Sequence, residues 1–389
     1  MTDVEVTPGS QAALRRANQQ RVVDALRSGG TLTQAELARH TGLSPASVSN
    51  IVRNLRAAGT ISVRETSSNG RRARAVTLIR PPGAVVAVDF RLTGITAALG
   101  DSQGAVLARE HIAYDVAAEP ERGVRRAVWL VETLLTRVRV DHATVAAVTA
   151  AVPGPVDLRT GEIGAITCMP RWAGYRPAEA LSARLGAPVR AENDANLCAL
   201  AEMRTGAAAE REHVIYVQLG EGVGAGIVVG GRLFRGAGGT AGEIGHIGLD
   251  ERGQVCRCGN RGCLETMLGS PYLLGMLPHQ GAGAPATVLE LVAAAEQGDP
   301  GCRRVVAEAG AALGRGLGVL ANTFNPQLVV LGGELVSAGE ALLEPVRRSL
   351  ELGTLGTARD DMGIVAGDLG EEAALRGALL LAAASAAET

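Results

Sequence analysis

Three cysteines fall within eight residues of the 389-residue chain, and a histidine lies ten residues before the first of them. Together they offer one imidazole and three potential thiolates: His246, Cys256, Cys258 and Cys263. In a cytosolic protein such a cluster is more often a metal site than a set of disulfides. Four ligands of this kind suit tetrahedral Zn²⁺ and leave no position for water, so we predict a structural zinc site. Reduced cysteines without a metal are the alternative.

The first 80 residues carry most of the positive charge of the chain. They hold 12 arginines and 5 acidic residues, which gives a net charge of +7, whereas the remainder carries −9. A basic head on an acidic body is the asymmetry expected when one end of a protein meets phosphates. A chance excess of surface charge would look the same, so the interpretation depends on the motifs of the head.

The head, residues 1–80, has the pattern of a winged helix-turn-helix. We expect three helices followed by two strands, at 14–27, 34–40, 45–58, 61–64 and 75–79. Thr33 and Glu36 have the spacing of a capping box at the start of the second helix. Gly42 supplies the tight turn, and Ser44 caps a third helix whose first turn holds Pro45, a position where proline is tolerated.

Polar side chains on the third helix suit phosphates and the base edges of a major groove. They are Ser44, Ser47, Ser49, Asn50 and Arg53. The polar tip of the hairpin, 67–72, and the start of its second strand add cations for the DNA backbone or a minor groove: Arg71, Arg72 and Arg74. The predicted partner is double-stranded operator DNA. A small three-helix interaction module with an arginine-rich tip is the alternative.

The body follows a linker at residues 81–83, Pro81-Pro82-Gly83. Apolar strands are expected at 84–89, 144–152, 214–219, 225–229 and 328–331. Helical stretches lie between them, as in an α/β body, and residues 371–387 form a helix that folds back onto it. The chain contains no apolar run long enough for a membrane span, and its polar, acidic start does not fit a signal peptide. We therefore expect a cytoplasmic protein with no membrane partner.

Four motifs follow one another along the body. They are Glu192-Asn193-Asp194-Ala195-Asn196, Gly220-Glu221-Gly222-Val223-Gly224-Ala225-Gly226, Glu243-Ile244-Gly245-His246, and the cysteine loop from Cys256 to Glu265. This order and spacing resemble the ROK family (repressors, open reading frames, kinases) from Ala84 to about Ala387. With the winged head, the chain is identified as a ROK transcriptional regulator of the xylose- and N-acetylglucosamine-repressor type.

The resemblance implies an actin-like, ribonuclease-H-like ATPase fold with two lobes. Lobe I would comprise 84–190 with 370–389, and lobe II would comprise 191–369 with the zinc and sugar sites. The family's sugar contacts match Asn193, Asp194, Glu243, His246 and Glu265, with Gly154 and Thr167 also approaching the ligand. The implied zinc ligands are the four named above, so His246 would serve both sites. Without the family, Glu243 and Glu265 would be interpreted as solvated acids.

The segments that bind phosphate in family kinases depart from the family pattern here. Asp194 matches the family's catalytic base. After the first strand, however, Arg91 and Leu92 replace the glycines of an Asp-x-Gly-Gly-Thr turn, which adds side chains where bare backbone should approach phosphate. The second loop has Glu221 where the family has threonine, and a carboxylate repels a triphosphate. We therefore expect a sugar sensor without kinase activity, in which Asp194 is a vestigial base.

Three functions remain open on the sequence. The first is a sugar-responsive regulator that acts as a homodimer or homotetramer on a palindromic operator. The second is an ATP-dependent hexose or N-acetylhexosamine kinase that also binds DNA. The third is a regulator that responds to another protein or to a phosphorylated metabolite. The sequence names neither the sugar nor the operator, and it does not separate repression from activation.

Overall fold

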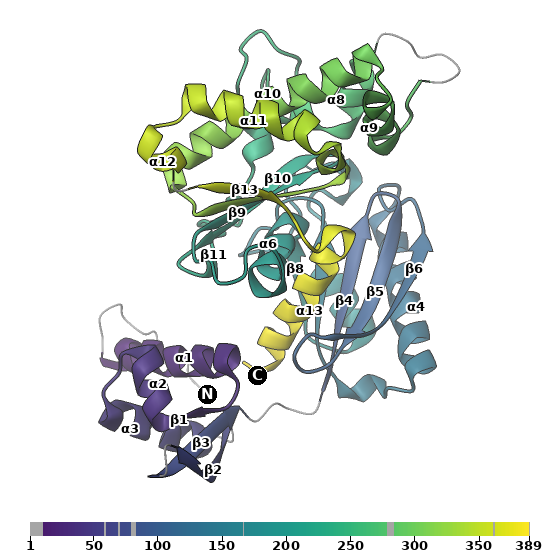
Figure 1. The fold of residues 1–389 in the computed structure, drawn as a ribbon. Helices are drawn as coiled ribbons and strands as arrows, with labels where there is room; N and C mark the ends of the chain where they lie inside the picture. Colours follow the sequence, from purple (N-terminus) through teal and green to yellow (C-terminus); the bar gives the residue numbers. More distant parts are fainter. Residues whose placement is uncertain are drawn as a thin grey trace. The chain divides into compact units, whose positions relative to one another are not determined.

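The computed structural model describes residues 11–57, 60–68, 71–78, 83–165, 167–277, 284–360 and 362–388. The chain divides into two compact units, Met1–Pro82 and Gly83–Thr389, and each is described by itself. The division falls inside the predicted linker at 81–83. Figure 1 shows the first unit in purple and dark blue, and the second unit from blue to yellow.

The first unit contains three helices and a three-stranded antiparallel sheet in the order β1-β3-β2. Its elements are α1 (Gln11–Gly29), β1 (Leu32–Thr33), α2 (Gln34–Thr41), α3 (Pro45–Ala57), β2 (Ile61–Ser68) and β3 (Arg71–Leu78). The predicted capping box is present, because the Thr33 hydroxyl accepts from the Glu36 amide and the Glu36 carboxylate accepts from the Thr33 amide. Helix α2 ends at Gly42, whose φ of 64° is the left-handed conformation that glycine favours.

The wing differs from the sequence prediction in length. The pairs Ser67↔Arg72 and Ser68↔Arg71 belong to the ladder, so most of the expected polar tip is strand. The ladder continues through polar residues because its hydrogen bonds are made by the backbone and do not depend on side-chain polarity. Strand β1 was not predicted, since two residues are too short to show any periodicity.

Lobe I of the second unit is a five-stranded sheet in the order β6-β5-β4-β7-β8, with helices on its outer face. Its elements are β4 (Ala84–Arg91), β5 (Gly94–Gly100), β6 (Val106–Ala113), α4 (Pro120–Val138), β7 (Val145–Val152), α5 (Pro177–Leu185) and β8 (Val189–Asn193), with short 3₁₀ helices at His142–Thr144 and Pro170–Trp172. Strands β4, β7 and β8 run parallel, so Asp89 and Asn193 lie at the same edge of the sheet. Strand β8 continues to Asn193, beyond the lobe boundary predicted at 190.

Lobe II is built on a second five-stranded sheet in the order β11-β10-β9-β12-β13. Its strands are β9 (Val214–Leu219), β10 (Val223–Val229), β11 (Arg232–Leu233), β12 (Leu328–Gly332) and β13 (Gly363–Ala366). Its outer helices are α7 (Glu265–Leu268), α8 (Ser270–Gly275), α9 (Val288–Glu296), α10 (Pro300–Phe324), α11 (Glu340–Gly353) and α12 (Gly356–Asp360), with 3₁₀ helices at Ile244–His246 and Glu334–Ala338. The five longer strands predicted for the body are all present.

Two helices lie between the sheets: α6 (Asp194–Thr205) and α13 (Ala373–Ala386), the latter preceded by a 3₁₀ turn at Gly370–Glu372. Their apolar residues form one core cluster with residues from both sheets. The contact with α6 is close on two sides. A Cβ on Gly377 of α13 would lie 2.0 Å from the Leu197 carbonyl oxygen, and one on Gly226 of β10 would lie 2.3 Å from the Ala195 carbonyl oxygen. Glycine is therefore required at both positions.

A buried carboxylate fixes the end of α6. Glu202 is 0% exposed and accepts hydrogen bonds from the amides of Ala207, Asp368 and Leu369 at 2.8, 3.3 and 2.9 Å. Asp368 and Leu369 belong to the segment that leads from β13 into α13. Glu202 therefore joins α6 to the second crossing of the chain between the lobes. Among the described residues, no helix is long and apolar enough to cross a membrane.

Candidate metal centre and ligand site

The four predicted metal ligands come together in one loop system. His246 ends the 3₁₀ helix Ile244–His246, and the cysteines lie in the loop that leads to α7. The ligand atoms of His246, Cys256, Cys258 and Cys263 all lie within 4.8 Å of one another. Gly262 makes the tight return of this loop possible, because a Cβ there would lie 1.7 Å from the Asp250 carbonyl oxygen.

The spacing of these atoms fits a tetrahedral ion. The Sγ atoms of Cys258 and Cys263 are 3.6 Å apart, and Cys256 Sγ lies 3.5 Å from His246 Nδ1. Bonds of about 2.3 Å to sulfur and 2.0–2.1 Å to nitrogen give tetrahedral edges of roughly 3.5–3.8 Å. A disulfide would bring the sulfurs to about 2.0 Å, and all three cysteines are free. This donor set therefore fits a closed, structural metal site.

The other side of the histidine ring meets an acid. His246 Nε2 lies 3.8 Å from Glu243 Oε2, while Nδ1 faces Cys256. A carboxylate behind a metal-binding imidazole orients the ring, as is usual in such centres. Burial lowers the pKa of His246, which favours the neutral imidazole that binds metal.

Four of the predicted sugar-binding residues lie together at the edge of lobe I. Asn193 caps α6 by accepting from the Asn196 amide at 3.1 Å, and its Nδ2 donates to the Gly154 carbonyl at 3.1 Å. The Thr167 hydroxyl donates to the Pro153 carbonyl at 2.8 Å, and a Cβ on Gly154 would lie 2.9 Å from that hydroxyl. Asp194 follows Asn193 as the first residue of α6.

The acids of the two lobes act on one another electrostatically. Burial, and then the charges of Asp194 and Glu265, raise the pKa of Glu243 to about 7. Burial, and then the charge of Asp89, raise the pKa of Asp194 to about 7. Glu265 is 4% exposed. The carboxyls of Asp194, Glu243 and Glu265 are thus close enough for their charges to influence one another.

Sequence reasoning gave no role to three residues that shape this site. Arg257 Nε lies 2.8 Å from Glu265 Oε1, which places a cation on a predicted ligand-binding acid. Glu192, 3% exposed, accepts from Arg235 at 2.6 Å and from Asn196 Nδ2 at 2.9 Å. Arg257 and Glu192 lie inside the recognised motifs, as do Glu265 and Asn196, but Arg235 comes from a distant segment and only the fold brings it to Glu192.

The turn after β4 also carries a side-chain contact that the sequence could not show. Arg91 Nε donates to Asp89 Oδ2 at 2.9 Å, and the guanidinium also contacts Glu371. Asp89 is 2% exposed; burial raises its pKa, and the Arg91 charge opposes that rise. Leu92 packs against the core of lobe I, and Glu221 is exposed at the turn between β9 and β10.

The predicted DNA-contacting face of α3 is open. Ser44, Ser49, Asn50 and Arg53 are exposed and Ser47 is half-buried, while Val48, Val52 and Leu55 face the core of the head. The Arg53 guanidinium contacts the Asn50 side chain. Arg74 is exposed on β3; the side chains of Arg71 and Arg72 lie outside the described residues.

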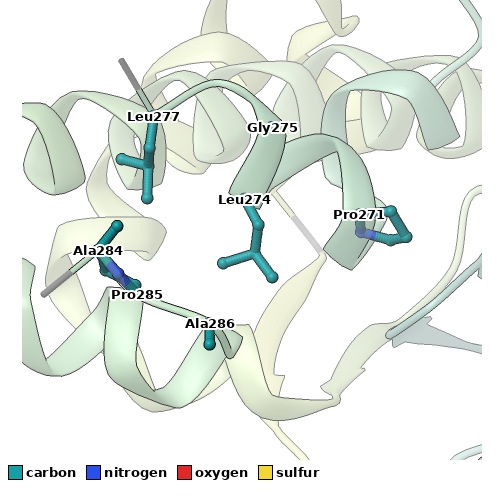
Figure 2. A pocket seen from close by; sticks show the side chains of 7 residues that line it. All are labelled: Pro271, Leu274, Gly275, Leu277, Ala284, Pro285 and Ala286. Atoms are coloured by element: carbon teal, nitrogen blue, oxygen red, sulfur yellow. The ribbon is translucent and has the colours of Figure 1, made fainter. Parts of the chain in front are cut away.

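Two surface hollows lie apart from the predicted site residues. One, of about 240 Å³, is lined by Pro271, Leu274, Gly275, Leu277 and residues 284–286, and Figure 2 shows that apolar side chains surround it. The other, of about 320 Å³, lies on α4 beside Arg122, Arg125, Arg126 and Trp129. The described residues that line the first offer no side-chain polar group that would orient a sugar.

Two family models match the chain, and together they cover both units. The ROK family model matches residues 85–385, and the MarR family model matches residues 16–73. The chain is 27% identical over 353 residues to the xylose repressor of Caldicellulosiruptor bescii, which covers 87% of this chain and 88% of that protein. It is 29% identical over 389 residues to the DNA-binding transcriptional dual regulator NagC of Escherichia coli, with 95% of each chain covered.

Solved structures of two kinds resemble the chain. A ROK family transcriptional regulator described as a homolog of the E. coli MLC protein matches with a TM-score of 0.79 and 25% identity, over 96% of this chain and 97% of that one. A ROK hexokinase from Thermus thermophilus matches with a TM-score of 0.65 and 32% identity, over 79% of this chain and 100% of its own. A ROK family glucokinase from Streptomyces griseus, in complex with glucose and AMPPNP, matches with a TM-score of 0.67 and 31% identity, over 77% and 99%.

The raised pKa of Asp194 predicts a pH-dependent stability. Its pKa of about 7 lies above the usual value of 3.8, so the folded chain holds this proton more tightly than the unfolded chain does. The stability from this site is complete below pH 3.8 and is lost as pH rises through about 7. Between pH 6 and 8 the free energy of unfolding of the native chain should fall by on the order of 1 to 2 kcal/mol more than that of Asp194→Asn. The difference is no larger because water partly screens the half-buried carboxyl.

Urea unfolding at several pH values measures this difference. Asp115→Asn, which removes an exposed carboxylate, controls for the change in net charge. Parallel pH profiles for the native chain and Asp194→Asn would contradict the assignment.

Proposed function

Because the chain belongs to the ROK family, we propose that it is a DNA-binding transcriptional regulator whose body responds to a sugar. One observation carries the proposal: a winged helix-turn-helix head and a ROK body lie on the same chain. The regulators aligned above extend over both units, whereas the hexokinase and glucokinase structures cover 79% and 77% of this chain. The head is therefore the part that this chain shares with regulators.

The sugar is proposed to bind at Asn193, Asp194, Glu243, His246 and Glu265, with Gly154 and Thr167 beside it. Asn193 and Asp194 belong to the edge of lobe I and the start of α6, whereas Glu243, His246 and Glu265 belong to lobe II. A ligand that contacts both groups favours the arrangement in which the lobes close on it. Such coupling between a ligand site and DNA affinity typically amounts to about 1–3 kcal/mol.

The metal is proposed to be Zn²⁺, held by His246, Cys256, Cys258 and Cys263. Three thiolates and one imidazole are the donors that zinc prefers, and the closed set of four makes its role structural. The ion would order the loop that leads to Glu265 and would fix the His246 ring beside Glu243.

The body is proposed to lack kinase activity. Arg91 directs its guanidinium at Asp89 and Glu371, where the turn after β4 would have to leave bare backbone for phosphate. Glu221 adds a carboxylate at the second glycine loop. Two like charges about 4 Å apart cost roughly 1 kcal/mol in water and several times more near a protein surface.

The head is proposed to read operator DNA through Ser44, which precedes α3, and through Ser47, Ser49, Asn50 and Arg53 on α3. The wing residues Arg71, Arg72 and Arg74 would contact phosphates or a minor groove. We propose that the chain acts as a homodimer or homotetramer, because two identical heads related by a two-fold axis match a palindromic site.

Removal of a cysteine ligand should abolish tight zinc binding. The native chain is expected to retain about one zinc per chain after dialysis, because four protein ligands close the site. Cys258→Ser should weaken the affinity for zinc by far more than the roughly 10–100-fold that is lost when a residue hydrogen-bonded to a metal ligand is substituted. Atomic emission measurements of zinc content, with Cys302→Ala as the control, decide this. A native chain without zinc would remove the metal from the proposal.

Loss of Glu243 should abolish the response to sugar and leave DNA binding intact. The operator is obtained by selecting duplexes from a random pool with the native chain, and a panel that includes xylose and N-acetylglucosamine is screened by thermal shift. Sugars that bind should change operator affinity about 5–150-fold in the native chain. The same sugars should leave the operator affinity of Glu243→Gln unchanged.

Glu251→Gln, an exposed change in the same lobe, is the matched control. A full response in Glu243→Gln places the sugar elsewhere. A native chain that binds DNA but no sugar of the panel favours a regulator that responds to another protein or to a phosphorylated metabolite.

The kinase alternative predicts ADP release with the same sugars and ATP. We expect no release above the protein-free rate, because the Arg91 and Glu221 side chains stand where phosphates would bind. A coupled assay measures it. Turnover that disappears in Asp194→Asn would show that Asp194 is a working base and would overturn the proposed absence of kinase activity.

A further inference from the structure

Arg257 stands between two metal ligands in sequence and reaches two other segments in space. Its neighbours along the chain are Cys256 and Cys258. Its Nε lies 2.8 Å from Glu265 Oε1 at the start of α7, and its Nη2 donates to the Glu221 carbonyl at 3.3 Å. The side chain is 28% exposed and that of Glu265 is 6% exposed, so the ion pair is largely shielded from water.

The segment from Gly220 to Val223, named here the glycine loop, is held against α7 and the start of α8. Val223 donates its amide to Glu265 Oε2 at 3.3 Å, and the Ser270 amide donates to the Gly220 carbonyl at 2.9 Å. The fit is close, since a Cβ on Gly222 would lie 3.0 Å from Glu265 Oε2. Glu265 therefore touches the glycine loop with one oxygen and Arg257 with the other.

Arg257 thereby closes a connection between three segments of lobe II. Its backbone lies in the loop 247–264 that leads to α7, named here the metal loop. Its Nε contacts Glu265 and its Nη2 contacts the glycine loop. An arginine can make these contacts together because its planar guanidinium presents several donors in a fixed fork. When the metal fixes Cys256 and Cys258, it also fixes the backbone from which this fork extends.

We propose that Arg257 is the positioning residue that couples the metal centre to the ligand site. It transmits the order of the metal loop to Glu265 and to the glycine loop, so that the occupied metal centre holds both in place. Since coupling between two sites is reciprocal, a ligand that binds Glu265 also tightens the hold on the metal, through the same side chain. This last consequence rests on the proposed sugar site.

The same loop offers a matched control. Arg261 also lies between metal ligands in sequence, and its guanidinium donates at 3.4 Å to the Gly253 carbonyl within the loop itself. Arg261→Gln therefore removes an arginine from the metal loop and leaves the contacts of Arg257 to α7 and to the glycine loop in place. A general loosening of the loop would affect both variants, whereas the proposed coupling distinguishes them.

Hydrogen exchange in the full-length chain tests the coupling without any sugar. Exchange is followed at the glycine loop and at the metal loop, with zinc bound and after chelation. In the native chain, chelation should speed exchange in both loops. In zinc-loaded Arg257→Gln, the glycine loop should already exchange about ten-fold faster, because a charge-assisted contact is lost. Chelation should then not speed exchange in the glycine loop any further, whereas exchange in the metal loop should still become faster.

Arg261→Gln should behave as the native chain does at the glycine loop. The proposal is overturned if glycine-loop exchange in zinc-loaded Arg257→Gln equals that of the native chain, or if chelation still accelerates it. Zinc content is measured for each variant. If Arg257→Gln fails to retain zinc, Arg257→Lys replaces it, since lysine keeps the charge but cannot make both contacts; unchanged glycine-loop exchange in that variant overturns the proposal equally.

The failures of the coupling and of the proposed function can be told apart. A chain that binds zinc and sugar but shows no Arg257-dependent exchange keeps its function and loses the coupling. A chain that binds no sugar, yet shows the exchange pattern, keeps the coupling and loses the sugar. Where sugar does bind, Arg257→Gln should weaken its affinity about ten-fold and Arg261→Gln should not.

Discussion

The body of this protein depends on how closely α6 is held between its two sheets. Gly377 and Gly226 bring α13 and β10 against the backbone of α6, so no side chain larger than hydrogen fits at either contact. Asn193 and Asp194 stand at the start of that helix, and Glu202 fixes its other end to the segment that enters α13. The position of these two ligand-site residues is therefore set by backbone packing between the lobes. Because α6 packs against both sheets, any movement of one lobe against the other must shift the contacts of this helix.

The predicted ligand-site residues of lobe II are positioned by a loop of metal-binding residue types and not by helix packing. The short loop of three cysteines and one histidine has little regular structure of its own, and an ion at its centre would hold it in place of a core. Glu243, behind the histidine ring, and Glu265, held by Arg257, both depend on that loop for their positions. The proposed ligand site thus joins a part ordered by packing to a part that the proposed ion would order. A ligand bound between the two parts would contact both, so its affinity would depend on the order of each.

Sequence reasoning succeeded where local rules decide the structure. The capping box of Thr33 and Glu36, the turn at Gly42, the five strands predicted for the body and the metal cluster all follow from residue types at short spacing. It missed β1 and the full length of the wing, because ladder hydrogen bonds extend through polar residues that show no apolar alternation. It missed the partners of Arg257, Glu192 and Arg91 for another reason. Glu221, Arg235 and Glu371 lie far from them in sequence, and only the fold brings each pair together.

The contact between Arg91 and Asp89 determines what a substitution of Arg91 would do to the stability of the fold. Asp89 is buried, and Arg91 supplies the charge that offsets it. Replacing Arg91 by glycine would leave that carboxylate without its cation near Asp194, itself a half-buried acid with a raised pKa. Arg91→Gly would therefore be expected to lower the stability of the folded body. The side chain that fills the turn after β4 is thus the one that offsets the charge of Asp89, so the shape of this turn and the stability of lobe I cannot be changed independently at position 91.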